Sequence, residues 1–484
     1  MKVTFLTPPA LFGQYAADRV YGCNYGYYPV PNIFLLTSAA VLEREGYEVA
    51  YVDGPMEKWT RKELTQFFAA DRSDIYLVYT VYLSQQTDHA TLELLREVRG
   101  NVPFVFMGTV PSEAPDRFLR DEQTYVVRGE PELTLVEFLA ALREKSRARA
   151  PLENILGLSF MQNGEKISNP MRPVMNDIDQ LPFPARHLVE RYKKKYYNPK
   201  IGVRPFTVLL ASRGCSYRCS YCVPCSSSFA MELEYKHFLQ RKPPVRQRSP
   251  ENLLAEVKML KEQGYRAISF MDDQFVWGEE RALAIAQGLK ELNIEWGCLA
   301  RADRLSEPVV KAFAESHCRY IDIGVESFRQ EILDDIHKDM KVETIYRAIA
   351  LLKKYGITCK INMLIGASPL ETEESILENI RIVKKIKPDS VMYGITNPFP
   401  GTEFHEIAKR EGWMLYDEYK PVDVQKECII SYPHLSRERL EKLARKANLS
   451  FFLSPSFLFQ NIRKIRSFPD FVNACMAYKR KLFD

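Results

Sequence analysis

The stretch ASRGCSYRCSYCVPC, residues 211–225, holds four of the chain's ten cysteines within eleven residues. Three of them, Cys215, Cys219 and Cys222, follow the spacing C-x3-C-x2-C. Three thiolates on one short loop suit an iron–sulfur cluster, and in a four-iron cluster they leave one iron open to a small chelating molecule. A zinc site is the alternative, but structural zinc usually has four protein ligands in two separated pairs. The sequence has no second Cys or His pair at a suitable spacing.

The composition is that of a soluble globular protein, because 46% of the residues are hydrophobic and 27% are charged. A length of 484 residues predicts two to four domains. The net charge of +5 is too small to indicate nucleic acid by itself. The first residues, MKVTFLTPPALFG, predict a buried strand and not a signal peptide, and no apolar run reaches about 18 residues. We therefore expect a cytoplasmic protein, in which clustered cysteines are metal ligands or redox groups.

Downstream of the cysteines, apolar strand-like runs alternate with amphipathic helical stretches such as 249–264 and 342–356. With the run before the cysteines, the expected strands are 206–214, 265–277, 294–305, 320–328, 357–369 and 389–402. Six βα units predict a parallel sheet of the barrel type, whose chemistry lies at the carboxyl ends of the strands.

Polar residues and a glycine stand at these strand ends: Asp272, Asp273, Arg301, Glu326, Ser327 and Gly366. Each alone has a simpler explanation as a solvated loop residue or a helix N-cap. Their succession at the ends of neighbouring strands behind a three-cysteine loop favours a common binding site.

The motif CSYRCSYC, with Tyr221 before its last cysteine, resembles the signature of radical S-adenosylmethionine (radical SAM) enzymes. The resemblance implies a [4Fe–4S] cluster on Cys215, Cys219 and Cys222, whose open iron chelates S-adenosylmethionine (SAM) for reductive cleavage. It also implies SAM contacts from the segments MDD, GVES and NMLIG. The expected cofactor-binding residues are Tyr221, Asp272, Asp273, Arg301, Glu326, Ser327 and Gly366, and an external electron donor such as flavodoxin or ferredoxin is implied.

Before the barrel, five strand-like runs lie at 3–9, 48–54, 74–83, 102–112 and 124–132. Helical stretches such as 34–46 and 90–100 separate them, which predicts a doubly wound α/β domain with its ligand beyond the carboxyl ends of the strands. A dinucleotide site is weakly supported, because the region contains no G-x-G-x-x-G.

The order of this domain, its phrases VVRGEPE and MGTVPS, and the segment 167–188 resemble the cobalamin-binding domain and linker of one large radical SAM class. The resemblance implies cobalamin contacts from Thr80, Val81, Tyr82, Gly108, Thr109, Gly129 and Glu130. The motif D-x-H-x-x-G, which supplies an axial histidine in many cobalamin proteins, is missing after the first strand, and His89 lies on an expected helix. The alternative is a domain that has lost its cofactor.

We expect four regions: a cobalamin-binding Rossmann-like domain (1–145), a linker (146–204), a partial (β/α)6 radical SAM barrel (205–404) and a helical carboxyl-terminal region (405–484). The last region becomes basic and aromatic after Pro455. Such a segment either rests on an anionic membrane surface or packs on the barrel. Cys225 is expected to be a free or second-sphere thiol, because a fourth protein ligand would block the open iron.

These features together predict a cobalamin-dependent radical SAM enzyme that modifies an unactivated carbon of a small natural-product or lipid-like substrate held between its domains. C-methylation is the first expectation. The alternative is methyl-free ring formation, ring contraction or oxidative cyclisation, with cobalamin as an electron-transfer centre, because the class includes the anaerobic magnesium-protoporphyrin ester cyclase and hopanoid-tailoring enzymes as well as C-methyltransferases. No nucleic-acid partner is expected, because no separate basic domain is visible. No catalytic residue can be named from the sequence.

Overall fold

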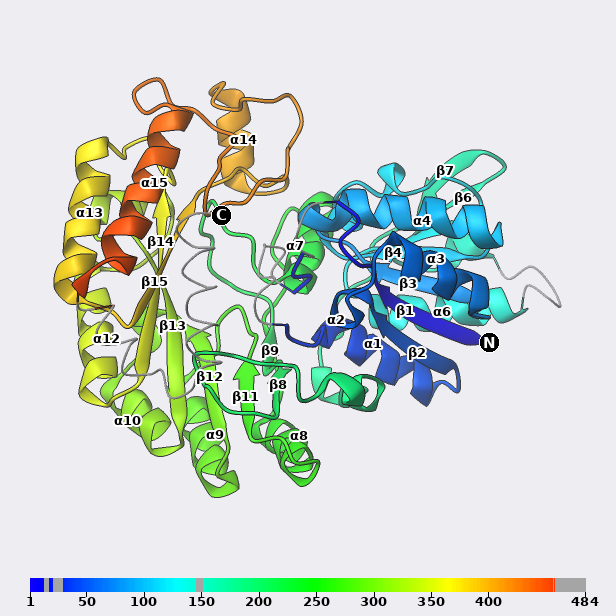
Figure 1. Cartoon of the computed structure of the whole chain (residues 1–484), viewed down its shortest axis with the longest axis horizontal. Helices are drawn as coiled ribbons and strands as arrows, with labels where there is room; N and C mark the ends of the chain where they lie inside the picture. Colours follow the sequence, from blue (N-terminus) through cyan, green and yellow to red (C-terminus); the bar gives the residue numbers. More distant parts are fainter. Residues whose placement is uncertain (13–16, 21–28, 145–150, 456, 458–484) are drawn as a thin grey trace. The chain divides into compact units, whose positions relative to one another are not determined.

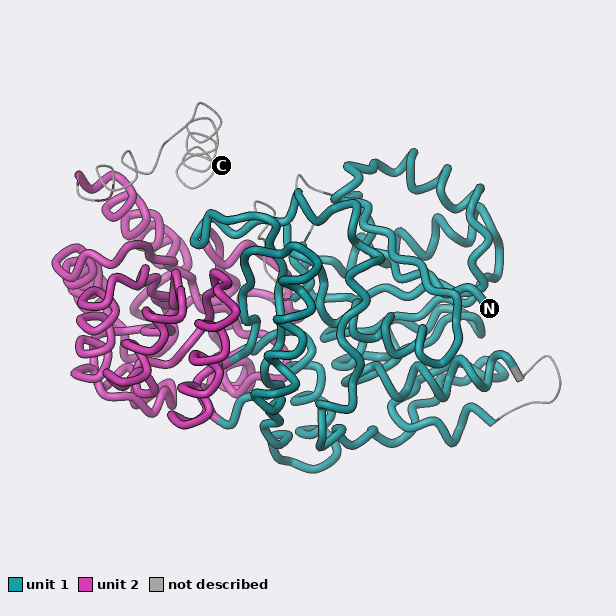
Figure 2. The backbone as a smooth tube through the Cα atoms, turned by 90° about the horizontal axis from the view of Figure 1, so that it is seen from below, with its two compact units in different colours: residues 1–216, 223–273 teal, residues 217–222, 274–484 magenta. Residues whose placement is uncertain are grey.

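The structure is a computed structural model, and it describes residues 1–12, 17–20, 29–144, 151–455 and 457 (Figure 1). The chain forms two compact units, coloured in Figure 2. Unit 1 comprises residues 1–216 and 223–273, and unit 2 comprises residues 217–222 and 274–484. The boundary after Asp273 falls inside the region that we expected to form one barrel.

Unit 1 opens with a sheet whose first five strands are parallel. They are β1 (Lys2–Thr7), β2 (Glu48–Asp53), β3 (Ile75–Tyr79), β4 (Phe104–Met107) and β5 (Thr124–Val127). The helices that connect them include α1 (Ile33–Arg44), α2 (Gly54–Glu57), α3 (Arg61–Ala70), α4 (Gln85–Arg99), α5 (Thr109–Glu113) and α6 (Pro131–Glu144). Every residue of β3, β4 and β5 is buried, as in sheets covered on both faces. The five predicted strands are confirmed.

Two antiparallel strands extend this sheet, giving the order β2-β1-β3-β4-β5-β6-β7. They are β6 (Leu158–Gln162) and β7 (Glu165–Ser168), which form a hairpin beside β5. The hairpin lies in the stretch that we expected to be a linker. The parallel part has the strand order 2-1-3-4-5 of flavodoxin-like doubly wound folds, whose switch point lies between β1 and β3.

The rest of unit 1 surrounds the start of the cysteine loop, defined here as residues 212–225. It consists of β8 (Phe206–Leu209), β9 (Ser212–Arg213), α7 (Ser226–Leu239), β10 (Arg246–Gln247), α8 (Pro250–Glu262) and β11 (Ala267–Phe270). β8 pairs with β11 in parallel, and β9 pairs with β10 in antiparallel. The expected strand before the cysteines is therefore present.

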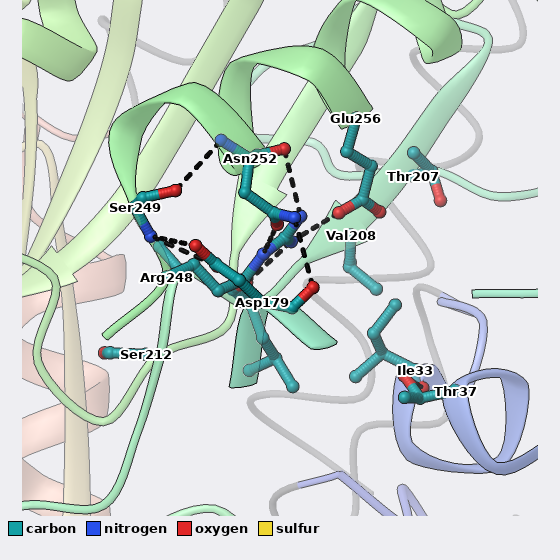
Figure 3. Close-up of polar contacts among 12 residues, drawn as sticks. Ile33, Thr37, Asp179, Thr207, Val208, Ser212, Arg248, Ser249, Asn252 and Glu256 are labelled. Carbon is teal, nitrogen blue, oxygen red and sulfur yellow. Dashed lines mark hydrogen bonds and ion pairs between the residues drawn. The ribbon is translucent and has the colours of Figure 1, made fainter. Parts of the chain in front are cut away.

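The linker stretch reaches the amino-terminal end of α8 (Figure 3). The carboxylate of Asp179 accepts hydrogen bonds from the N–H of Ser249 at 3.1 and 3.2 Å, and Ser249 Oγ caps the helix by accepting from the N–H of Asn252. A carboxylate is favourable there because the first N–H groups of a helix have no partner within the helix. Asp179 therefore fixes the linker stretch to α8.

The described residues of unit 2 form four parallel strands, β12 (Glu295–Ala300), β13 (Cys318–Glu326), β14 (Thr358–Ile365) and β15 (Ser390–Ile395). The helices of this described part are α9 (Glu279–Leu292), α10 (Glu307–Glu315), α11 (Gln330–Asp335), α12 (Val342–Lys354), α13 (Glu373–Ile386), α14 (Glu403–Arg410) and α15 (Arg437–Phe452). Helices α10, α12 and α15 contact β13, β14 and β15 respectively. With β8 and β11 of unit 1, all six expected strands are present.

Strand β14 and the helix after it show why the strands and helices of this region can be predicted from the sequence. Its side chains alternate between buried and half-buried positions from Thr358 to Ile365. The helix that follows, α13, begins with a capping box in which the Thr372 and Ser375 side chains bond to each other's backbone N–H.

The described part of the chain contains no helix that is long and apolar enough to cross a membrane. Most of the basic and aromatic segment after Pro455, residues 458–484, lies outside the described residues, so the expected membrane contact stays a prediction.

Candidate active site

The cysteine loop begins with β9, and its three motif cysteines differ from the others. Cys215, Cys219 and Cys222 are half-buried, whereas Cys225 and the four singly placed cysteines Cys298, Cys318, Cys359 and Cys428 are buried. The single cysteines thus behave as small hydrophobes, as expected; Cys23 and Cys475 lie outside the described residues. Within the described ranges, no three His, Cys, Asp or Glu side chains converge as the ligands of one metal ion. The cluster assignment therefore rests on spacing and thiol chemistry.

The middle of the loop is positioned by backbone hydrogen bonds within unit 2. The N–H of Cys222 donates to the carbonyl of Cys219 at 3.1 Å, which forms a turn between two of the motif cysteines. Ser220 donates its N–H to the carbonyl of Ile336 at 3.1 Å and accepts from the N–H of Phe404 at 2.9 Å. The turn is thus attached to the residue after α11 and to the first turn of α14.

A buried ion pair lies beside Tyr221 of the loop. Lys338 Nζ lies 2.7 Å from Glu326 Oε1, and both side chains are less than a tenth exposed. Burial would lower the pKa of Lys338, but Glu326 and Cys219 raise it above its usual value, so the ammonium is charged. Lys338 Nζ lies 3.5 Å from the Tyr221 hydroxyl. Burial, together with the charges of Glu326, Cys219 and Cys222, raises the pKa of Tyr221, which stays a phenol.

The backbone at the end of β13 is shaped to bring this pair together. The strand register shifts between Gly324 and Glu326, and Glu326 adopts φ of +65°, which is uncommon for a residue other than glycine. A Cβ at Gly324 would lie 2.7 Å from Glu326 Oε1 and 2.9 Å from Lys338 Nζ. Only glycine leaves room for the ion pair at this point.

Arg301, which follows β12, joins three parts of unit 2. Its guanidinium carbon lies 3.6 Å from the centre of the Tyr217 ring, on the cysteine loop. Nη2 donates to the carbonyl of Lys338 at 2.8 Å, and Nε donates to Asp303 Oδ1 at 2.9 Å. Burial opposes the charge of Arg301, but Asp303 and the nearby Tyr217 and Cys219 raise its pKa. The sequence-predicted Tyr221, Arg301 and Glu326 thus share one region with Lys338.

Ser327 and Gly366 are engaged by the protein at the ends of β13 and β14. Ser327 Oγ accepts from the amide of Asn379 at 3.1 Å. Gly366 has φ of +72°, and its carbonyl accepts from the Tyr432 hydroxyl at 3.0 Å. A Cβ at Gly366 would lie 3.1 Å from the Leu440 side chain. The contacts explain why these residue types occur here, and the expected SAM contacts stay predictions.

Asp272 and Asp273, directly after β11 in unit 1, hold the two ends of the cysteine loop. Asp272 Oδ1 accepts from the N–H of Ala211 at 2.9 Å and from Oγ of Ser212 at 2.8 Å, where the loop begins. Asp273 Oδ1 accepts from the N–H of Cys225 at 2.6 Å, where the loop ends. Neighbouring carboxylates therefore fasten both ends to one strand, and direct SAM contact by either stays a prediction.

Cys225 is the N-cap residue of α7, and its thiol is a hydrogen-bonded neutral group. Its Sγ lies 3.3 Å from Ser228 Oγ. Burial, helped by the charge of Asp273, raises the pKa of Cys225 well above its usual value. Because metal coordination itself deprotonates a thiol, the expectation that Cys225 does not bind the cluster stays a prediction.

Three of the residues expected at cobalamin follow β3. Thr80 is fully buried, and its Oγ1 has no hydrogen-bond partner among the residues that the structure describes. The N–H of Val81 donates to Ser84 Oγ at 3.0 Å, and Tyr82 is buried. These residues stand beside the switch point of the sheet.

The other four, after β4 and β5, are engaged by the protein. Thr109 Oγ1 donates to the carbonyl of Ser226 on α7 at 3.1 Å. Gly108 and Gly129 have φ of +102° and +68°, and a Cβ would lie 2.7 Å from the Thr80 carbonyl in the first case and 3.0 Å from the Met231 sulfur in the second. Glu130 is bound by two arginines, described below. The contacts leave the cobalamin role of these four a prediction.

Two buried charged side chains of the candidate site escaped the sequence analysis. Lys338 stands in IHKDM, between the buried residues Ile336 and Met340, and a single lysine flanked by apolar residues is the only signal that the sequence offers. Arg213, just before the cysteines, is buried and charged. Its partners are more than 80 residues away along the chain, where spacing rules do not reach.

Comparison with known proteins identifies the class. The radical SAM superfamily matches residues 209–368. A protein named "Uncharacterized methyltransferase PH0819", from Pyrococcus horikoshii, is 30% identical over 472 residues, which are 96% of this chain and 95% of that protein. The chain therefore belongs to the radical SAM superfamily and is an enzyme, as predicted. The anaerobic magnesium-protoporphyrin IX monomethyl ester cyclase of Rubrivivax gelatinosus is 21% identical, covering 94% of this chain and 80% of the cyclase.

Two solved structures share the fold. The radical SAM methyltransferase TsrM from Kitasatospora setae, solved with tryptophan and a SAM analogue, matches with a TM-score of 0.67 and 17% identity, covering 94% of this chain and 90% of TsrM. The cobalamin-dependent radical SAM enzyme OxsB, solved with aqua-cobalamin and SAM, matches with a TM-score of 0.70 and 16% identity, covering 99% of this chain and 71% of OxsB. An α/β architecture with parallel sheets and a radical SAM domain is thus confirmed.

Proposed function

We propose that this radical SAM enzyme uses SAM, a [4Fe–4S] cluster and cobalamin to methylate an unactivated carbon of a small molecule. The name of the Pyrococcus relative and the chemistry of TsrM favour methyl transfer. Methyl-free ring chemistry, as the name of the Rubrivivax relative indicates, is the second candidate.

The observation that carries the proposal is the buried Glu326–Lys338 pair beside Tyr221. The methionine part of SAM bears an α-ammonium and an α-carboxylate group. The carboxylate of Glu326 and the ammonium of Lys338 lie 2.7 Å apart and are buried, so they offer SAM an oppositely charged partner for each of these two groups. Lys338 would take the carboxylate of SAM and Glu326 its ammonium group, next to the loop that binds the cluster.

The donor set of the cysteine loop fits an iron–sulfur cluster. Cys215, Cys219 and Cys222 are half-buried thiols, and three thiolates bring negative charge that the protein must balance. The positive charges of Arg301 and Lys338 offset part of this negative charge, because each interacts favourably with Cys219. Cys215, Cys219 and Cys222 are therefore the proposed ligands.

The residues at the switch point fit cobalamin in part. Thr80 offers a buried hydroxyl without a partner in the described chain, and ligands of doubly wound sheets bind at the switch point. Val81 and Tyr82 would line the same place, whereas Gly108, Thr109, Gly129 and Glu130 already have protein partners. We therefore propose that Thr80, Val81 and Tyr82 hold the cofactor. His89, which follows these residues in the sequence, packs against Phe118 with ring centres 4.7 Å apart, so we do not expect it to hold the cofactor.

When bound, the cluster and SAM would supply a carbon radical for hydrogen abstraction, and cobalamin would supply a transferable methyl group. The chain's own part is to orient SAM through Glu326 and Lys338 and to fix the cysteine loop through Arg301. Tyr221, held as a phenol, would donate a hydrogen bond to an anionic group of SAM or to Glu326. An external electron donor, such as flavodoxin or ferredoxin, stays part of the proposal.

The test uses the anaerobically reconstituted, reduced full chain with SAM that carries a deuterated methyl group. We expect cluster absorbance and formation of 5'-deoxyadenosine. We also expect a small molecule from the extract of expressing cells to exchange one hydrogen for a trideuteromethyl group. Lys338→Met should raise the SAM concentration needed for half-maximal cleavage, whereas Lys354→Met, at an exposed ion pair, should not.

Each outcome has a distinct meaning. SAM cleavage without transfer of label would replace methylation by methyl-free chemistry. A cobalt(II) electron paramagnetic resonance (EPR) spectrum split by an axial nitrogen would contradict the histidine-free assignment, and failure of Thr80→Val to weaken cobalamin retention would remove the proposed contact. Absence of both cluster and SAM cleavage would overturn the proposed function.

A further inference from the structure

Four charged side chains of unit 1 form a buried network at the start of the cysteine loop. Both guanidinium nitrogens Nη1 and Nη2 of Arg246 donate to the carboxylate of Glu130, each at 2.7 Å. Arg213 Nη2 donates to Glu132 Oε1 at 2.7 Å, and its Nη1 lies 3.5 Å from Glu130 Oε1. All four side chains are less than a tenth exposed. The network contains two positive and two negative charges, so it is neutral as a whole.

The two arginines need the two carboxylates. Arg213 on β9 and Arg246 on β10 are direct partners in the antiparallel pair, and like charges opposite each other on paired strands repel. Glu130 and Glu132 come from a different element, the turn after β5 and the first turn of α6. The pairing of β9 with β10 therefore depends on carboxylates supplied by the amino-terminal sheet.

Arg213 lies directly before Gly214 and Cys215, the first motif cysteine. The backbone on its other side is also fixed: the N–H of Arg248 donates to the carbonyl of Ala211 at 3.0 Å, and its Nη1 donates to the carbonyl of Leu210 at 3.2 Å. Figure 3 shows Arg248 held in turn by Asn252 and Glu256 of α8. The position of Cys215 is thus set by side chains that hold the residues before it.

Both carboxylate oxygens of Glu130 are already bound by arginine side chains. Its two carboxylate oxygens each accept from Arg246, and burial, which would raise its pKa, is outweighed by Arg213 and Arg246, which lower it. Moving Glu130 onto a cofactor would leave two buried guanidinium groups with one carboxylate between them, which is unfavourable.

We infer that Glu130 and Glu132 are positioning residues for the cysteine loop and that they act on the cluster through Arg213 and Arg246. This inference rests on the proposed function, because it needs a cluster on the loop. It gives the turn VVRGEPE a role different from the cobalamin contact that its resemblance implied. It predicts that a change in this turn alters the cluster without removing any cluster ligand.

The experiment compares the full-length Glu132→Gln variant with the wild type after anaerobic reconstitution. Glutamine keeps the size of the side chain but removes its charge. Arg213 then keeps only one of its two carboxylate partners, Glu130. We expect a shifted midpoint potential and a changed EPR spectrum of the reduced cluster, together with unaltered cobalamin retention. Glu132→Asp, which keeps the charge, should restore the wild-type signals in part.

The matched control is Glu234→Gln. Glu234 and Arg128 form another buried pair in unit 1, with both side chains less than a twentieth exposed, and Arg128 follows β5 just as Glu130 does. This variant should leave the potential and the EPR spectrum unchanged. Wild-type cluster signals in Glu132→Gln, or loss of cobalamin with an unaltered cluster, would overturn the inference. A wild-type protein without any cluster would overturn the proposed function and the inference with it.

If Glu132→Gln fails to fold, Glu130→Gln provides the second variant, because Arg213 then keeps Glu132. A folded Glu130→Gln protein with wild-type cluster signals would equally overturn the inference.

Discussion

Replacing Lys338 by methionine should destabilise unit 2 strongly, because it leaves Glu326 buried without a partner. At 2.7 Å, two unit charges attract by about 6 kcal/mol at an effective dielectric constant of about 20. Their desolvation offsets most of this gain, so the pair as a whole contributes little. Removing one partner alone typically costs about 3–5 kcal/mol, since an uncompensated charge stays behind. We expect Lys338→Met to fall in this range.

The measurement is urea unfolding of the cofactor-free protein, followed by tryptophan fluorescence. Three of the four tryptophans, at positions 277, 296 and 413, belong to unit 2, so the signal reports mainly on that unit. The double variant Glu326→Gln/Lys338→Met removes both charges and should recover most of the lost stability. Lys354→Met, at the exposed pair with Glu307, should leave the transition at the wild-type urea concentration.

Two results would refute this reasoning. A loss below about 1 kcal/mol in Lys338→Met would mean that Glu326 reaches water or another partner when Lys338 is gone. Additive losses in the double variant would mean that the two side chains do not interact, since coupled residues give non-additive changes.

Three further predictions concern the cysteine loop, Gly324 beside the Glu326–Lys338 ion pair, and the buried carboxyl group of Glu371. Replacing Cys215, Cys219 and Cys222 together by alanine should abolish [4Fe–4S] absorbance, whereas Cys225→Ala should keep it; loss of absorbance in the second variant would contradict the ligand assignment. Gly324→Ala should weaken SAM binding and lower the urea midpoint, because its Cβ would push apart Glu326 and Lys338; a wild-type midpoint would show that the pair can shift freely. Burial raises the pKa of Glu371 from 4.5 to about 8, so wild-type stability should fall as pH rises from about 4.5 to 8. The free energy of unfolding should fall less steeply with rising pH in Glu371→Gln than in the wild type. Parallel pH curves for the two proteins would rule out the titration of Glu371 as the cause.

The positions of the strands could be predicted, because buried parallel strands are short apolar runs and connecting helices repeat their own period. The hairpin β6–β7 could not. Its second strand, Glu165–Ser168, is mostly exposed and carries no apolar run. The hairpin forms at the edge of β5, where β6 pairs with β5 and β7 pairs with β6. That edge is a property of the assembled sheet and not of the four residues of β7.

The cysteine motif and several charged residues near it could also be predicted, because metal ligands need close spacing and barrel chemistry gathers at strand ends. The partners of those residues could not. Glu130 and Glu132 meet Arg213 only after the chain has folded, and Lys338 meets Glu326 because a shifted register turns Glu326 toward it. A sequence gives residue types at strand ends but not which of them bind each other.

The hairpin β6–β7 also determines how the first sheet ends. Without it, Thr124–Val127 would be an outer strand, apolar and with unpaired backbone groups, which is a typical template for aggregation. β7 is short and bears Glu165 and Lys166, and such strands resist pairing with another molecule. A chain lacking residues 158–168 should therefore scatter light by self-association at concentrations where the intact protein does not.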